Sequence, residues 1–167
     1  NISLNEVYNI IANNSKYGIW MGTNISNAVI SRNNVHGFGY TNTTAYSTHG
    51  IYFSSTTGCT NNQVDNNIIY DLRSYGSTTT TTSPVGIRIV GGDGYKIYFN
   101  TVSLTDAIGS ATAGVFSHGL MVSTASTNMD IRNNIFYNAR TGGTTPKNYV
   151  IYTITGTTFT NINYNNY

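Results

Sequence analysis

Short stretches of alternating apolar and polar residues recur along this chain at a nearly constant interval. In each copy a glycine is followed by an apolar, a variable and an apolar residue. The four copies are Gly18-Ile19-Trp20-Met21, Gly50-Ile51-Tyr52-Phe53, Gly86-Ile87-Arg88-Ile89 and Gly119-Leu120-Met121-Val122. A period of two predicts strands, and no window carries the sustained 3.6-residue apolar period of a helix. The pattern therefore predicts an all-β chain with essentially no helix.

A second mark, an asparagine followed two residues later by an aliphatic residue, runs in phase with the first. It occurs at Asn5, Asn33, Asn66, Asn100 and Asn133 and begins again at Asn165. Successive asparagines lie 28, 33, 34, 33 and 32 residues apart. A third mark is an apolar residue shortly before each asparagine, at Ile2, Ile30, Val64, Ile97, Ile131 and Ile162. A fixed repeat of about 33 residues that holds two or three short strands is typical of a solenoid.

This repeat resembles the right-handed parallel β-helix of the pectate-lyase-like architecture, and the resemblance covers the whole chain. The composition agrees with it, because Thr (26 residues) and Tyr (14) suit a pleated surface, and Asn (24) tolerates the sharp corners between strands. Leucine-rich repeats fit poorly, since the chain has only four Leu. The repeats predict a single domain, residues 1–167, of about five coils. The sequence starts inside one copy of the asparagine motif and stops inside another, so both ends of the solenoid are expected to be open.

Stacked coils place equivalent residues about 4.8 Å apart in continuous rows. Three inward rows are expected: Ile19, Ile51, Ile87 and Leu120; Met21, Phe53, Ile89 and Val122; and Val7, Val35, Ile68, Val102 and Ile135. The asparagines are expected to stack as an amide ladder through Asn5, Asn33, Asn66, Asn100, Asn133 and Asn165.

The partners that these features predict are limited. The open ends favour either a piece of a longer β-helix or identical subunits stacked end to end in a filament. The net charge is +2 and only 8% of residues are charged, without a basic stripe, so nucleic acid is not an expected partner. No apolar span suits membrane insertion.

No cofactor or metal site is expected, and Cys59 is expected to be a buried thiol. This composition is typical of secreted or cell-surface bacterial β-proteins.

A candidate ligand-binding row lies on the outer side of the glycine-containing strand. The variable residues Trp20, Tyr52, Arg88 and Met121 must point outward, because neighbours on a strand face opposite sides. Aromatic faces can pack on sugar rings, and Arg can bind a carboxylate. Long polar segments that recur at one corner, residues 37–49, 74–85, 105–118 and 138–148, lie next to this row. The alternative is that these side chains pack beneath those segments.

Catalytic signals are weaker. His49-Gly50 and His118-Gly119 precede the row and faintly resemble the Gly-His-Gly segment of β-helical polygalacturonases, although Thr48 and Ser117 stand where that segment has Gly. Glycoside hydrolysis normally uses two opposed carboxylates. The six acids, Glu6, Asp65, Asp71, Asp93, Asp106 and Asp130, form no such cluster in the sequence. The sequence leaves enzymatic activity open. It favours a structural or adhesive module that contacts polysaccharide through Trp20, Tyr52, Arg88, Met121, His49 and His118. A polysaccharide lyase or glycoside hydrolase is the alternative.

Overall fold

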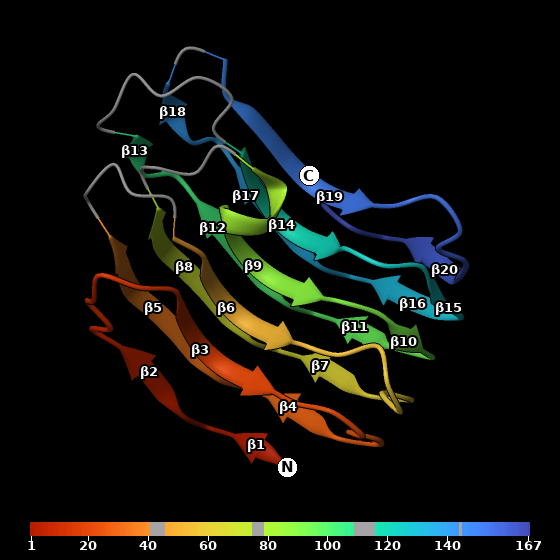
Figure 1. Ribbon diagram of the computed structural model, residues 1–167. Helices are drawn as coiled ribbons and strands as arrows, with labels where there is room; N and C mark the ends of the chain where they lie inside the picture. Colours follow the sequence, from red (N-terminus) through yellow and green to blue (C-terminus); the bar gives the residue numbers. More distant parts are fainter. Residues whose placement is uncertain (41–45, 75–78, 109–115, 144) are drawn as a thin grey trace.

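The chain is a parallel β-helix (Figure 1). The computed structural model describes residues 1–40, 46–74, 79–108, 116–143 and 145–167. Parts of the four predicted polar segments, residues 41–45, 75–78, 109–115 and 144, lie outside the described residues. Every strand pairing among the described residues is parallel, so the predicted all-β solenoid is confirmed.

Three long sheets, named A, B and C here, each receive one strand per coil. Sheet A contains β1 (Ile2–Ser3), β4 (Val29–Ser31), β7 (Gln63–Asp65), β11 (Lys96–Tyr98), β16 (Met129–Arg132) and β20 (Phe159–Asn163). Sheet B contains β2 (Glu6–Tyr8), β5 (Asn34–Tyr40), β8 (Ile68–Ser74), β12 (Thr101–Leu104) and β17 (Ile135–Asn138). Sheet C contains β3 (Lys16–Met21), β6 (Thr48–Phe53), β9 (Pro84–Ile89), β14 (Phe116–Val122) and β19 (Lys147–Thr153). The strands form about four turns of the solenoid, slightly fewer than the predicted five.

Two small sheets and one short helical turn complete the described structure. They are β10 (Gly92–Asp93) with β15 (Ser126–Thr127), β13 (Ala107–Ile108) with β18 (Thr141–Gly142), and the 3-10 helix η1 (Thr80–Thr82). No α-helix occurs in the described ranges, as the alternating sequence pattern predicts.

The inward rows form one continuous core. In sheet C, Ile19, Ile51, Ile87 and Leu120 are in register and at most 6% exposed. The row of Met21, Phe53, Ile89 and Val122 is also confirmed by the pairing. In sheet A, the apolar residues that precede the repeated asparagines form another row in register. Its members are Ile2, Ile30, Val64, Ile97, Ile131 and Ile162.

The prediction for sheet B was wrong at two positions. Ile68 and Ile135 are 51% and 47% exposed and point outward. The residues in register with Val102 are Ile69 and Phe136, which are fully buried. A slip of one residue moves a strand's side chains to the opposite face.

The same slip affects the asparagine ladder, which exists but runs through Asn67 and Asn134 rather than Asn66 and Asn133. Its members are Asn5, Asn33, Asn67, Asn100, Asn134 and Asn165. Each side-chain Nδ2 donates to the Oδ1 of the next coil's asparagine at 2.9–3.0 Å, as between Asn67 and Asn100. Each backbone N–H donates to the same oxygen at 3.0–3.1 Å. The ladder therefore satisfies buried polar groups at the corner between sheets A and B.

The residue just before each ladder asparagine turns the chain with a positive φ of 55° to 61°. These corner residues are Leu4, Arg32, Asn66, Phe99, Asn133 and Tyr164, and all six are exposed. Asn tolerates this left-handed conformation best among non-glycine residues, which explains why Asn occupies two of these corners. Asn66 donates to its neighbour Asp65 (2.7 Å) instead of joining the ladder.

The repeated glycine of sheet C is required by close packing between coils. A Cβ at Gly50 would lie 2.6 Å from both the carbonyl oxygen of Gly86 and the Ile69 side chain. At Gly86 it would lie 2.3 Å from the Val102 side chain. Only glycine fits where the backbone of sheet C approaches the core side chains of sheet B.

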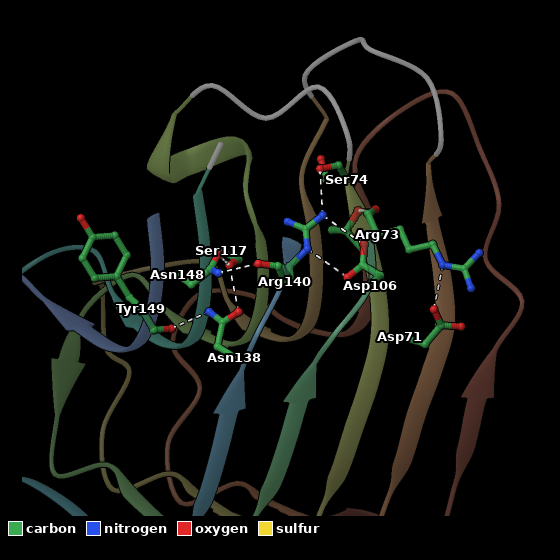
Figure 2. Close-up of polar contacts among 10 residues, drawn as sticks. Asp71, Arg73, Ser74, Asp106, Ser117, Asn138, Arg140, Asn148 and Tyr149 are labelled. Atoms are coloured by element: carbon green, nitrogen blue, oxygen red, sulfur yellow. Dashed lines mark hydrogen bonds and ion pairs between the residues drawn. The ribbon is translucent and has the colours of Figure 1, made fainter. Parts of the chain in front are cut away.

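The connections from sheet B to sheet C contain the polar segments, and a network of hydrogen bonds ties this corner together (Figure 2). The fully buried Arg140 side chain donates to both carboxylate oxygens of Asp106, at 2.9 and 3.1 Å. The Asn148 side chain donates to the Arg140 carbonyl (2.7 Å), and the Asn138 side chain donates to the Tyr149 carbonyl (2.8 Å). The network fixes the ends of sheets B and C relative to each other.

Candidate functional site

The predicted outward row of sheet C is confirmed in its register. Trp20 pairs with Tyr52, Tyr52 with Arg88, and Arg88 with Met121. The structure adds Tyr152, which pairs with Met121 on β19. The row therefore places three aromatic side chains, a guanidinium and a thioether side by side on one sheet.

Exposure along this row is uneven. Trp20 is 64% exposed and Tyr52 is half-buried, whereas Arg88 and Met121 are 9% and 2% exposed. Arg88 and Met121 are therefore in the predicted outward row but are covered rather than exposed. For Arg88 the reason is the segment before β9: Nη1 of Arg88 donates to the Thr81 carbonyl at 3.2 Å. The alternative from the sequence, packing beneath a polar segment, is correct for this residue.

His49 and His118 belong to a second outward row, which the sequence analysis found only in part. The row also contains Tyr17, Val85 and Tyr149, all in register. Each member stands three residues before a member of the first row, as His49 does before Tyr52. This constant offset would have shown that these residues form a row. Strict alternation would not have placed the row outward, because the pairing of sheet C skips the glycine between the two rows. Both histidines are fully buried.

An aromatic cluster occupies one half of this face. The Tyr17 ring lies 5.1 Å from Tyr52, 5.5 Å from Trp20 and 5.4 Å from His49, between ring centroids. The Tyr17 and Tyr52 rings are nearly parallel, with 24° between their planes. We call Tyr17, Trp20 and Tyr52 the aromatic platform. It presents exposed ring surface that a flat apolar partner could cover.

Arg88 borders the aromatic platform and is a buried cation without a carboxylate partner among the described residues. Its guanidinium lies 5.2 Å from the Tyr52 ring centroid and 3.5 Å from Nε2 of His49. Its Nε is buried and makes no hydrogen bond to the described part of the chain. A buried charge is costly unless it is paired. The site would therefore be stabilised by an anionic group.

Both neighbouring imidazoles favour the neutral form. Burial, and then the charge of Arg88, lower the pKa of His118 to about 4. The same two causes hold the pKa of His49 well below its ordinary value. The Ser83 hydroxyl donates its proton to the Thr80 carbonyl (2.7 Å), so Nδ1 of His118 must donate to Ser83 Oγ at 2.9 Å. Nε2 of His118 is then a buried acceptor with no partner in the described residues.

No acidic residue lies on sheet C, and all six acids of the chain fall within the described residues. Asp71, Asp106 and Asp130 pair with Arg73, Arg140 and Arg132, and Glu6 contacts His36. Asp65 and Asp93 accept hydrogen bonds from neighbouring polar side chains. The face gives no support to hydrolysis by a pair of carboxylates.

The described residues were also searched for a metal site, a disulfide and a membrane-spanning helix. They contain no group of three or more His, Cys, Asp or Glu side chains that could hold a metal ion. Cys59 is buried as a free thiol, as expected. No helix in the described part is long and apolar enough to cross a membrane.

A scan against protein-family models and searches of curated proteins and of solved structures found no match to this chain.

Proposed function

We propose that this chain is an extracellular structural or adhesive β-solenoid module that holds polysaccharide on the outer face of sheet C. The observation that carries the proposal is the aromatic platform, where the 64% exposed Trp20 stands beside Tyr17 and Tyr52. Exposed aromatic rings are costly in water and pack well on the apolar faces of sugar rings.

Arg88 extends the proposal to acidic glycans. Its guanidinium lies against Tyr52 and has no carboxylate partner among the described residues. A uronate carboxylate near the platform would supply the missing counter-charge, and Arg binds carboxylates in a two-pronged geometry. Binding rather than hydrolysis fits this face because none of the six acids lies on it.

The test is a glycan array of neutral and uronate-containing polysaccharides, followed by calorimetric titration of each hit. Trp20→Ala and Tyr52→Ala are each expected to weaken binding about fivefold or more, the equivalent of about 1 kcal/mol of stacking. Phe99→Ala is the matched control, because Phe99 is 56% exposed on a different corner of the solenoid. It should leave the affinity unchanged.

Arg88→Gln is expected to reduce affinity for acidic glycans and to leave neutral ones nearly unaffected. Absence of binding to every polysaccharide would refute the glycan-binding part of the proposal. Release of unsaturated or reducing-end products, lost in Arg88→Gln or His118→Ala, would replace the proposal with lyase or hydrolase activity.

A further inference from the structure

The outer face of sheet B carries a stack of nearly parallel rings. The Tyr8 and His36 rings are 5.7 Å apart with 8° between their planes, and the His36 and Tyr70 rings are 4.7 Å apart with 3° between theirs. These residues are in register on β2, β5 and β8. Nε2 of His36 also contacts the Glu6 carboxylate at 3.2 Å, which helps to hold the ring in place.

The stack is interrupted by one small residue. Ser103 on β12 is in register with Tyr70 on one side and with Tyr137 on the other. Two strand spacings, roughly 9.6 Å, therefore separate the strand positions of Tyr70 and Tyr137. Stacked rings prefer centroids about 4.5–7 Å apart, so the gap has the width for one further ring.

A groove of about 600 Å³ opens along β8 and β12, on the Tyr70 side of this gap. The pairing of β8 with β12 ends at Tyr70 and Ser103, and the next residue of β8, Asp71, has the left-handed conformation (φ 51°). The lining of the groove includes Tyr70, the hydroxyl residues Thr101, Ser103 and Thr105, and the carboxylates of Asp71 and Asp106.

The polar residues that line the groove indicate which class of ligand ring would fit there. Hydroxyl and carboxylate groups beside one aromatic face match the hydroxyl-rich edge and apolar face of a sugar better than a plain aromatic ring. The charges at the groove are already compensated, since Arg73 donates to Asp71 at 2.7 Å and Arg140 holds Asp106 (Figure 2). A charged ligand would have to disturb these pairs, whereas a neutral one would not.

We propose that this groove binds a neutral pyranose ring, which stacks on the face of Tyr70 away from His36 and covers Ser103. The site lies on sheet B and does not depend on the aromatic platform of sheet C. A single sugar ring makes few contacts, so the affinity is expected to be roughly millimolar.

The test is an NMR titration of the intact chain with the methyl glycosides of glucose, galactose and mannose, with phenol as the flat aromatic comparison. At least one glycoside should shift resonances of Tyr70, Ser103 and Tyr137. Ser103→Tyr should fill the gap with a ring from the chain and weaken this binding at least tenfold. The fold should be retained, because Tyr suits an outward strand position beside another aromatic residue.

Ser103→Ala is the matched control, since it leaves the gap open, and its affinity should stay within about threefold of the wild type. Tyr70→Ala should weaken binding like Ser103→Tyr. The proposal is overturned if no glycoside binds, if only phenol binds, or if Ser103→Tyr binds as the wild type does. Shifts confined to Trp20 and Tyr52 would also overturn it, while supporting the site on sheet C.

Discussion

Replacement of Asn67 by Leu tests the register of the asparagine ladder. Asn67 is fully buried, and its Oδ1 accepts from the backbone N–H of Asn33 (3.0 Å) and from the Asn33 side chain (2.9 Å). Its Nδ2 donates to the Ile30 carbonyl and to Oδ1 of Asn100, both at 2.9 Å. Leu has nearly the same size but can make none of these bonds.

The expected cost follows from the donors that lose their acceptor. Two buried N–H groups of Asn33 would have no partner, at about 1–3 kcal/mol each. The apolar side chain of Leu offsets about 1–2 kcal/mol by its own burial. The free energy of unfolding should therefore fall by about 2–4 kcal/mol despite the more hydrophobic residue. For a chain of this length, that corresponds to a midpoint roughly 5–15 °C lower.

The measurement is thermal and urea unfolding followed by far-UV circular dichroism, with Asn66→Gly as the matched control in the same coil. Asn66 is exposed and has a φ of 56°, which glycine adopts without strain. Its replacement should change stability by less than about 0.5 kcal/mol. If Asn67→Leu melts like the wild type, or if Asn66→Gly is equally destabilising, the ladder is not built as described.

Three further changes test the core, a buried histidine and a corner. Ile87→Ala should cost about 2–5 kcal/mol in urea unfolding, because Ile87 is fully buried between Ile51 and Leu120; an unchanged midpoint would contradict the core register. The pKa of His118 is about 4 when folded and near 6.5 when unfolded, so only the unfolded chain gains this proton between these values. The contribution of His118 to stability should therefore fall by up to about 3 kcal/mol as pH drops from 6.5 to 4, and the His118→Gln chain should lose less stability over this range than the wild type; an equal slope would refute this. Phe99→Asn should raise stability by about 0.5–1 kcal/mol, since Phe99 has a φ of 55° and Asn tolerates it better; a loss of stability would show that the Phe99 ring makes a favourable contact.

The repeat in the sequence was sufficient to predict the sheets, most inward rows and the existence of the ladder. It could not fix the register at Asn66-Asn67, because both asparagines satisfy the pattern, and at Asn133-Asn134 it favoured Asn133, because Phe136 is aromatic. The deciding factor is the conformation of the corner residue, which does not show in an apolar pattern. This slip also concealed the ring stack of sheet B, whose members stand three residues after the ladder asparagines, as Tyr70 does after Asn67.

The candidate site on sheet C was predictable in position but not in exposure. Strand alternation was enough to place Trp20, Tyr52 and Arg88 in one outward row. The burial of Arg88 depends on the Thr81 carbonyl, which reaches it from a polar segment with no periodic pattern. Contacts between an irregular segment and a sheet depend on the whole fold, so the sequence alone could not show that a guanidinium would be enclosed without a carboxylate.

The exposed side chains at the left-handed corners do not take part in the core of this solenoid. One exposed side chain per coil projects there, at intervals of roughly 4.8 Å along one edge. The adjacent ladder asparagine satisfies the buried polar groups, so the corner side chain has no task in the core. Leu, Arg, Asn, Phe and Tyr all occupy it in this chain. The corner residues thus form an evenly spaced line along one edge. Each of them could be substituted to attach a different chemical group, while the fold of the coils stays the same.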